Sequence, residues 1–192
     1  MNIEIELIDI CFIKRILYMY CREEKESQKS FYRIINDDLR TRNPSKIFRY
    51  LDLLSLINKL IENEELASYK GKVYRATKLD EKLILKLKPN TIMVNTTFWS
   101  TSKDFKIAEK FVKNQKWRNS YIICETVKNN IDIEFEKLNP YAEKEVLFLP
   151  FTEFKVKKIS IENKYKKKIY VIELYELEIK ILLIMIICIY KM

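Results

Sequence analysis

The chain has 192 residues, of which 48% are hydrophobic and 33% are charged, and its formal net charge at pH 7 is +9. This length and balance are typical of one globular domain with its own core rather than of a disordered chain. The sequence contains no histidine and a single glycine, Gly71. Histidine-dependent catalysis, histidine-ligated metal sites and the glycine-rich phosphate loops of P-loop and Rossmann proteins are therefore excluded.

The first third of the chain is predicted to be helical. Apolar residues over 3–22 indicate one helix, and the polar stretch Glu23–Lys29 connects it to the next. A second helix is expected to start near Phe31 and to end at the Asn43-Pro44 pair. Ser45 is predicted as the N-cap of a third helix. The side chains that this third helix is expected to bury are Ile47, Phe48, Leu51, Leu54, Ile57, Leu60 and Ile61.

The pattern changes after Gly71, where short strands dominate. Two helices are predicted among them: Asp80–Lys88, which Pro89 ends, and about Lys103–Lys113, which Ser102 can cap. The predicted strands are Lys72–Ala76, Ile92–Val94, Thr96–Ser100, Tyr121–Val127, Ile131–Phe135, Glu145–Leu149, Phe154–Ser160 and Ile169–Leu177. The expected fold class is α+β, with the N-terminal helices packed on a mostly antiparallel β core of two sheets.

Much of the excess positive charge lies near the C-terminus. The lysines concerned are Lys155, Lys157, Lys158, Lys164, Lys166, Lys167 and Lys168. They flank a predicted turn at Glu162-Asn163, so a solvated hairpin end explains them, whereas a nucleic-acid surface would interleave arginines and aromatic residues. Nucleic acid is therefore not expected as a partner, although a basic chain favours anionic partners such as nucleotides.

The cysteines and the apolar segments bear on the compartment. Cys11, Cys21, Cys124 and Cys188 show no CxxC spacing, so we predict free, mostly buried thiols rather than a zinc cluster. The apolar run Ile181–Tyr190 is shorter than the roughly 20 residues of a spanning helix, so no transmembrane span is predicted. Acidic residues near the N-terminus do not fit a signal peptide. These features favour a reducing, cytoplasmic location and leave secretion open.

Three short segments stand on or beside predicted strands: Tyr74-Arg75, Ser100-Thr101-Ser102 and Glu143-Lys144-Glu145. In their contexts, VYRA, TFWSTSKDFKIAEKF and EKEVLFLPFTEFKV, they resemble the three conserved blocks of the arginine-specific mono-ADP-ribosyltransferases of the R-S-E class. The run FYRIINDDLR is similar to the helix that precedes the first block in that family. The resemblance extends from Phe31 to Leu177, which is most of the chain.

The resemblance implies an ADP-ribosyltransferase-like fold and an NAD-dependent activity. Such an enzyme breaks the bond between nicotinamide and ribose in NAD and moves ADP-ribose to an arginine side chain of a target protein. NAD is then a co-substrate, and no metal is needed. We expect a monomer in which residues 1–30 are a helical N-terminal extension, 31–178 are the ADP-ribosyltransferase domain and 179–192 are an apolar C-terminal tail.

The same resemblance assigns roles to individual residues. Glu145 is the expected catalytic carboxylate, which accepts a hydrogen bond from a ribose hydroxyl and stabilises an oxocarbenium-like ribose. Glu143 is expected to orient the acceptor guanidinium, and a strand would place both carboxylates on one face. Arg75 is expected to hold the NAD phosphate, and Ser100 to bind near the ribose and to position Glu145.

Further residues are expected to contact NAD or its acceptor. Phe111 falls where the family stacks an aromatic ring on nicotinamide, and Ala76 replaces the usual glycine, which narrows the nicotinamide pocket. Trp99 is a candidate for the pocket wall and Tyr141 for acceptor recognition. The remaining expected NAD-binding residues are Tyr74, Thr101 and Ser102.

Each assignment has a structural alternative. Glu145 could be a surface glutamate on an edge strand, Arg75 a partner in a surface salt bridge, and Phe111 a residue of the core. Two other functions also stay open for the whole chain. One is an NAD glycohydrolase that uses the same site with water as the acceptor. The other is a catalytically silent or nucleic-acid-binding basic module.

Overall fold

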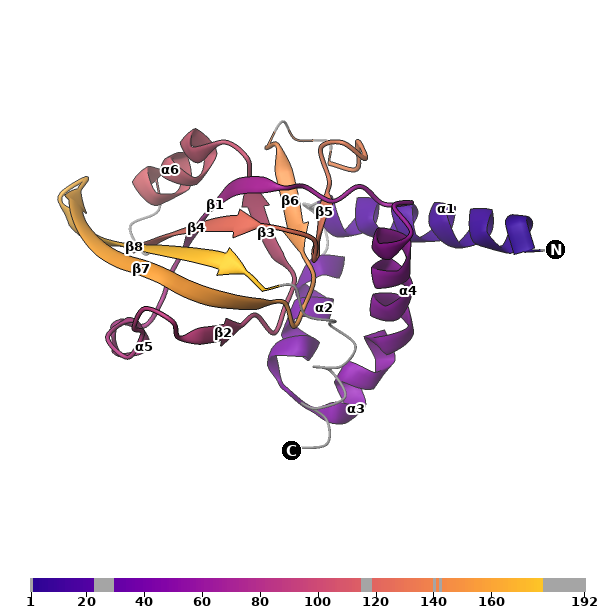
Figure 1. Ribbon diagram of the computed structural model, residues 1–192, viewed down its shortest axis with the longest axis horizontal. Coiled ribbons are helices and arrows are strands. Elements are labelled where there is room, and N and C mark those ends of the chain that lie inside the picture. Colours follow the sequence, from indigo (N-terminus) through magenta and orange to yellow (C-terminus); the bar gives the residue numbers. More distant parts are fainter. Residues whose placement is uncertain (1, 23–29, 115–118, 140, 142, 178–192) are drawn as a thin grey trace.

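The computed structural model describes residues 2–22, 30–114, 119–139, 141 and 143–177. Helices α1, α2 and α4 lie together at one end of the sheet, and α6 lies beside β1, β3 and β4 (Figure 1). The helices are α1 (Asn2–Cys21), α2 (Phe31–Arg40), α3 (Pro44–Ile47), the 3₁₀ turn η1 (Phe48–Tyr50), α4 (Leu51–Glu62), α5 (Glu81–Ile84) and α6 (Phe105–Asn114). The strands are β1 (Gly71–Thr77), β2 (Ile92–Val94), β3 (Trp99–Ser102), β4 (Ser120–Thr126), β5 (Asn130–Asp132), β6 (Glu145–Phe148), β7 (Glu153–Lys164) and β8 (Lys167–Glu176).

The predicted third helix is divided in the structure. Asn43 caps its first piece, because the Asn43 side chain accepts a hydrogen bond from the Ser45 N–H at 3.0 Å and Pro44 occupies the first turn. The prediction of Ser45 as the N-cap is therefore wrong. The 3₁₀ turn η1 then changes the helical phase, which leaves Phe48 52% exposed where burial was expected.

All eight strands belong to one sheet, in the order β2-β7-β8-β4-β1-β3-β6-β5. The prediction of two sheets is therefore wrong, although the mostly antiparallel character holds, with β4 and β8 as the parallel pair. A narrow junction makes the strands one sheet. Strands β2-β7-β8-β4-β1 form one wing and β3-β6-β5 form the other, and the register pair Tyr74↔Ser102 between β1 and β3 connects the two wings, which would otherwise be separate sheets.

The sheet curls so strongly that its two wings pack face to face. Four strands separate β6 from β7, and in a flat sheet that would place them roughly 24 Å apart. Yet the rings of Phe148 in β6 and Phe154 in β7 have centroids 5.0 Å apart. Trp99 from β3 stacks on Phe154 at 5.2 Å. The core of a two-layered structure is thus built from one continuous sheet.

The short strand β6 is buried on both of its faces. Val146 and Phe148 point into the core between the two wings, whereas Leu147 belongs to the core on the helical side. All four residues of β6 are buried. By the alternation of a strand, Glu145 shares its face with Leu147 and therefore looks toward the helices.

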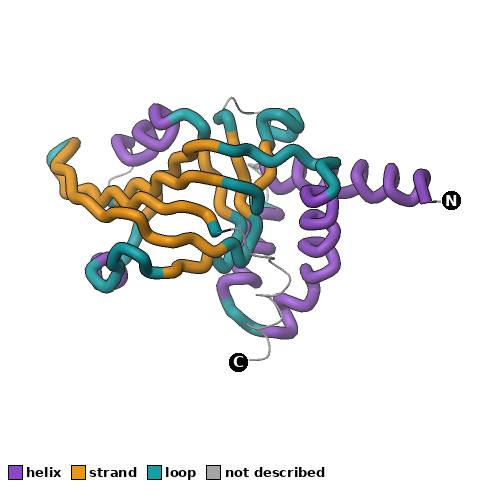
Figure 2. The backbone as a smooth tube through the Cα atoms, viewed as in Figure 1, coloured by secondary structure: helices purple, strands orange, loops and turns teal. Residues whose placement is uncertain are grey.

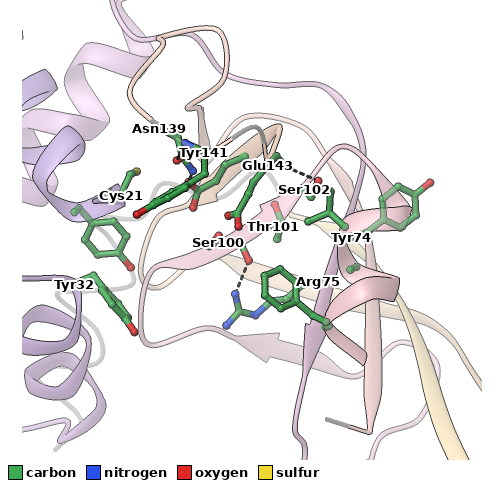
Figure 3. Close-up of a pocket in the computed structure, with 16 residues that line it drawn as sticks. Cys21, Tyr32, Tyr74, Arg75, Ser100, Thr101, Ser102, Asn139, Tyr141 and Glu143 are labelled. Atoms are coloured by element: carbon green, nitrogen blue, oxygen red, sulfur yellow. Dashed lines mark hydrogen bonds between the residues drawn. The ribbon is translucent and has the colours of Figure 1, made fainter. Parts of the chain in front are cut away.

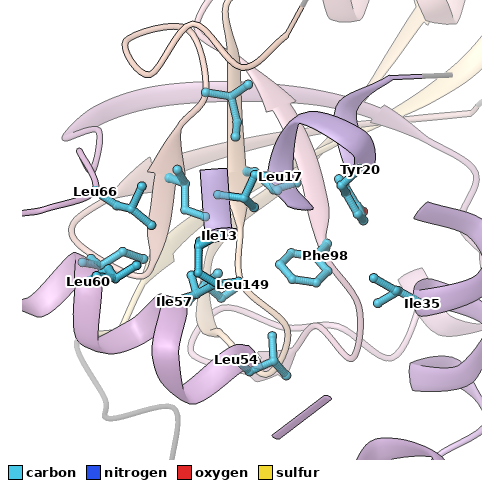
Figure 4. Close-up of a cluster of buried hydrophobic side chains, with 14 of the residues drawn as sticks. Ile13, Leu17, Tyr20, Ile35, Leu54, Ile57, Leu60, Leu66, Phe98 and Leu149 are labelled. Atoms are coloured by element: carbon cyan, nitrogen blue, oxygen red, sulfur yellow. The ribbon is translucent and has the colours of Figure 1, made fainter. Parts of the chain in front are cut away.

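The helical core joins α1, α2 and α4 to the β3-β6-β5 wing. Ile13 and Leu17 of α1 are fully buried there, together with Ile57 of α4, Phe98 before β3 and Leu149 after β6 (Figure 4). A third, smaller core packs α6 on the opposite face of β1, β4 and β8. Helix α1 is thus anchored to the same strands that carry the central predicted site residues.

The lysine-rich hairpin has the predicted kind but a different turn. Tyr165 and Lys166 form a two-residue turn with φ values of 55° and 58°, and Lys164 pairs with Lys167 beside it. The turn therefore lies beyond the predicted Glu162-Asn163. The long β7–β8 hairpin extends away from the rest of the sheet and ends in this turn (Figure 2).

Some sequence-based expectations concern residues outside the described part of the chain. These are the connector Glu23–Lys29, Cys188 and the run Ile181–Tyr190. Among the described cysteines, Cys11 is exposed, Cys21 is partly buried and Cys124 is buried, and all three are free thiols. No helix within the described residues combines the length and apolar character that crossing a membrane would require.

Glu176 at the end of β8 holds the loop that follows β4. Its carboxylate accepts hydrogen bonds from the backbone N–H groups of Val127 at 2.7 Å, Lys128 at 3.2 Å and Asn129. We expect Glu176→Ala to lower the free energy of unfolding by about 2–4 kcal/mol, because each buried donor left unpaired costs about 1–3 kcal/mol. Urea denaturation measures this change.

The control for this prediction is Glu173→Ala, which removes a partly exposed carboxylate of the same strand. We expect it to change the free energy of unfolding by less than about 1 kcal/mol. Equal losses in the two variants would contradict the structural role of Glu176.

Candidate active site

A cavity of about 430 Å³ lies where the helical end of the molecule meets β1, β3, β6 and α6. Its volume falls within the usual range of about 300–1,000 Å³ for small-molecule sites. All nine residues predicted to be catalytic or NAD-binding line it: Tyr74, Arg75, Ala76, Ser100, Thr101, Ser102, Phe111, Glu143 and Glu145. Tyr141 lines it as well, and is 45% exposed.

The two sides of the cavity come from distant parts of the chain. Cys21 and Tyr32 lie on the helical side, opposite Tyr74 and Arg75 of β1 (Figure 3). Ser100 and Thr101 of β3 lie between these two sides. The cavity therefore opens at the narrow β1–β3 junction, where the two wings of the sheet meet.

Glu145 is buried at the start of β6, with 6% of its surface exposed. Asn139 Nδ2 donates a hydrogen bond to its Oε2 at 2.5 Å, and the side chains of Ser100 and Cys21 are its other hydrogen-bond partners. This burial is incompatible with the alternative of a surface glutamate on an edge strand.

Burial raises the pKa of Glu145, because a carboxylate loses its hydration in this environment. Hydrogen bonds from Ser100, Asn139 and Cys21 and the positive charge of Arg75 act in the opposite direction. The protein therefore keeps a carboxyl group in a partly dry cavity while supplying four groups that favour its ionised form. Such an arrangement is typical of functional carboxylates.

Glu143 reaches the cavity by a different route from the predicted one. It precedes β6, and Lys144 between the two glutamates has a φ of 48°, so the strand alternation does not apply to this pair. The loop is held instead by backbone hydrogen bonds, from Lys103 N–H to Lys144 O at 3.0 Å and from Glu143 N–H to Tyr141 O at 2.8 Å. Both carboxylates line the cavity because this loop returns toward it.

Ser102 connects this loop to the start of α6. Its hydroxyl donates to Glu143 O at 2.7 Å and accepts a hydrogen bond from the Asp104 N–H at 3.0 Å. The N-cap of α6 is Asp104, whose carboxylate accepts from the Lys106 N–H at 3.0 Å, so the prediction that Ser102 caps this helix is wrong. Thr101 donates to Val146 O at 2.7 Å and so joins β3 to β6 beside Glu145.

Arg75 extends across the junction between the two wings. Its Nη1 donates a hydrogen bond to the Ser100 carbonyl oxygen, and its guanidinium carbon lies 5.9 Å from the centre of the Trp99 ring. Trp99, a candidate for the pocket wall, does not line the cavity and belongs to the core between the wings. Its contact with Arg75 nevertheless supports the guanidinium from behind.

Phe111 and Ala76 take part in both the cavity and a core. Each lines the cavity, and each packs in the small core between α6 and the sheet. The two expectations for Phe111, a ligand-facing ring and a core residue, are therefore compatible. Ala76 is 3% exposed and forms part of the cavity wall.

Sequence reasoning missed several residues of the cavity. Tyr20 and Cys21 come from the end of α1 and Tyr32 from α2, and their distance along the chain from the three motifs gave no signal. Asn139 could have been suspected, because it is a polar residue in the loop just before the Glu143-Lys144-Glu145 segment. Ile107 and Ala108 of α6 also line the cavity, on the helix face predicted to point inward.

Comparison with solved structures identifies the fold. The ADP-ribosyltransferase Vis from Vibrio splendidus, solved in complex with agmatine, aligns over 87% of this chain and 74% of its own, with a TM-score of 0.64 and 21% identity. HopU1 of Pseudomonas syringae pv. Tomato DC3000 aligns over 86% and 76%, with a TM-score of 0.65 and 17% identity.

Plx2a, an ADP-ribosyltransferase toxin from Paenibacillus larvae, aligns over 87% of this chain and 86% of its own, with a TM-score of 0.59 and 18% identity. No family model and no curated protein sequence matches the chain. The structural likeness therefore confirms the expected ADP-ribosyltransferase-like fold.

The hydrogen bonds of the Ser102 hydroxyl stabilise the loop that carries Glu143. We expect Ser102→Ala to lower the free energy of unfolding by about 1–2 kcal/mol, because two hydrogen bonds at a buried residue are lost. Hydrogen exchange of the Asp104 amide should become faster at the same time, which NMR measures. Ser55→Ala, an exposed substitution within α4, serves as the control and should leave both quantities nearly unchanged.

Proposed function

We propose that this protein is an NAD-dependent mono-ADP-ribosyltransferase that transfers ADP-ribose to arginine side chains of target proteins and releases nicotinamide. One observation carries the proposal. The buried carboxylate of Glu145 shares one cavity with a second carboxylate, Glu143. Glu145 is hydrogen-bonded to Ser100 and interacts electrostatically with the positive charge of Arg75. The fold that this cavity belongs to is that of ADP-ribosyltransferases.

The chemistry of the lining fits NAD. The Arg75 guanidinium supplies a planar set of donors for a phosphate group. Aromatic rings on both sides of the cavity supply surfaces for the nicotinamide and adenine rings: those of Tyr20, Tyr32, Tyr74 and Phe111. Since the sequence has one glycine, the phosphates are held by side chains rather than by a glycine-rich loop.

Glu145 is the residue that acts on the ribose. Nicotinamide already leaves as a neutral molecule from a positively charged precursor, so this step needs no metal and no strong acid. The ionised Glu145 accepts a hydrogen bond from a ribose hydroxyl and offsets the positive charge that develops on the sugar. Low exposure of Glu145 strengthens this interaction, because the effective dielectric constant is lower than in water.

Glu143 acts on the acceptor. A guanidinium has a pKa above about 12, so it needs an anionic partner that orients it and receives its proton during transfer. Glu143 is partly exposed at the mouth of the cavity, beside the exposed Tyr141, where a side chain of another protein can reach it. The complex of Vis with agmatine, an arginine analogue, supports arginine as the acceptor class for this chain.

Nicotinamide release from NAD by the purified protein, with and without agmatine, tests this proposal. We expect the wild-type protein to modify agmatine and Glu145→Ala to lose at least about a thousandfold in kcat, because the charge that stabilises the transition state is gone. We expect Glu143→Gln to hydrolyse NAD without modifying agmatine, since its amide cannot accept the acceptor proton.

The matched control is Glu162→Gln, which neutralises a partly exposed hairpin carboxylate outside the cavity lining and should retain both activities. Wild-type protein that consumes NAD without ever modifying agmatine or a protein arginine would instead favour the glycohydrolase. Wild-type protein that neither binds nor consumes NAD would refute the proposal.

The substitution Arg75→Lys tests the proposed role of Arg75 in NAD binding. Lysine keeps the charge and loses the planar fork, so we expect the KM for NAD to rise about tenfold with a smaller change in kcat. Steady-state kinetics at varied NAD concentration measure the two constants. Arg40→Lys, a change in a surface ion pair with Asp37, is the control and should leave both constants unchanged; an unchanged KM in Arg75→Lys would contradict the phosphate role.

A further inference from the structure

We propose that Cys21, the last residue of α1, is a positioning residue for Glu145, so that the N-terminal helix completes the active site. This inference rests on the proposed function, because it concerns the same carboxylate. It gives the N-terminal segment a direct part in the chemistry, and it assigns a role to a cysteine that lies far from the three motifs in the sequence.

The geometry begins with the face of β6 on which Glu145 stands. Glu145 shares that face with Leu147, which packs in the helical core with Ile13 and Leu17 of α1. The carboxylate therefore lies on the side of β6 that faces the C-terminal end of α1. There the Cys21 side chain lines the same cavity and is hydrogen-bonded to Glu145.

A buried network fixes the end of α1 relative to the catalytic strands. Asn36 Nδ2 of α2 donates to the Tyr20 hydroxyl at 2.7 Å, and Asn36 Oδ1 accepts from the Phe98 N–H at 3.0 Å. The rings of Tyr20 and Phe98 also lie 5.0 Å apart. Phe98 directly precedes β3, which carries Ser100, so α1 and β3 are held to one another through Asn36.

Three donors from three parts of the chain converge on Glu145. Ser100 comes from β3, Asn139 from the loop before β6 and Cys21 from α1. A carboxylate has about four lone-pair sites, so three protein donors leave about one acceptor site for a substrate hydroxyl. The donors thus restrict the orientation of the carboxylate, which lines the cavity.

The thiol is suited to donate rather than to react. Burial and the nearby carboxylates of Glu145 and Glu143 raise the pKa of Cys21, so the group keeps its proton at neutral pH. A protonated thiol is a weak donor, whereas a thiolate would repel Glu145. Cys21 is therefore poorly suited to act as a nucleophile.

Loss of the thiol has a predictable effect on pH dependence. A donor to a carboxylate favours its ionised form, so removing Cys21 raises the pKa of Glu145. The reaction needs ionised Glu145. On acidification, the variant therefore loses activity at a higher pH than the wild-type protein does. Among the residues that the structure describes, the other charged or titratable groups that face Glu145 or line the cavity are Arg75 of β1, Tyr20 of α1, Tyr32 of α2, Tyr74 of β1, and Tyr141 and Glu143 of the loop before β6.

The experiment compares Cys21→Ala, Cys21→Ser and Cys11→Ala in the full-length protein. For Cys21→Ala we expect kcat for nicotinamide release to fall about three- to tenfold, with the KM for NAD within about twofold of wild type. The acid side of its pH–rate profile should move to higher pH. Cys21→Ser, which keeps a donor, should restore both kcat and the profile.

Cys11→Ala is the matched control, because Cys11 is an exposed cysteine of the same helix. Tyr20→Phe, which removes the acceptor of Asn36, should move kcat in the same direction as Cys21→Ala, while Tyr18→Phe, an exposed tyrosine of α1, should not. Thermal unfolding of each variant identifies losses that come from misfolding. The inference is overturned if Cys21→Ala keeps the wild-type kcat and pH profile, or if Cys21→Ser is as impaired as Cys21→Ala.

A measurement without substrate separates this inference from the proposed function. Titration of the Glu145 carboxyl carbon by NMR, assigned by difference with Glu145→Gln, reads its pKa directly. A higher pKa in Cys21→Ala than in wild type or Cys21→Ser supports the positioning role even if the protein does not consume NAD. Equal pKa values in the three proteins would refute it even if the transferase activity is established.

Discussion

A single pair of residues, Tyr74 and Ser102, joins the two wings of the sheet, and the architecture of the cavity depends on this junction. Because β1 and β3 meet at one register pair, the wings can fold toward one another and bring Phe148 against Phe154. The Arg75 side chain then spans the junction to the Ser100 carbonyl. One wing thereby contributes the cation of the cavity and the other contributes its buried carboxylate.

The cavity also concentrates an electrostatic conflict. Glu145 loses hydration on burial, and hydrogen bonds from Ser100, Asn139 and Cys21 together with the charge of Arg75 oppose the resulting preference for the protonated form. These groups come from α1, β1, β3 and the loop before β6, so the ionised carboxylate depends on the complete fold. A protein tolerates such an arrangement where its chemistry requires it, at the expense of stability.

The absence of histidine and the single glycine restrict which residues can carry out chemistry or bind anions in such a site. Without histidine, the proposed function assigns the acid–base and charge-stabilising roles to carboxylates, and burial shifts the pKa of one of them, Glu145. With one glycine, the proposed binding of the NAD phosphates relies on a guanidinium on a strand rather than on a glycine-rich backbone loop. Loop geometry that glycine often supplies is provided here by other residues, such as Lys144 with its φ of 48° between the two glutamates.

The sequence by itself determined the element types, the α+β class and the three segments that line the cavity, because hydrophobic periodicity and short motifs are local properties. It could not determine the number of sheets, since one register pair decides whether two wings are joined. It also missed Tyr20 and Cys21, which reach the cavity because Ile13 and Leu17 bury α1 against β6, and Tyr32, which reaches it because Ile35 and Leu39 bury α2 in the same core. Even Glu143, placed correctly in the cavity, arrives there through loop hydrogen bonds rather than strand alternation. Contacts between residues distant in the chain were decided by packing and by long-range hydrogen bonds, which leave no periodic signal in the sequence.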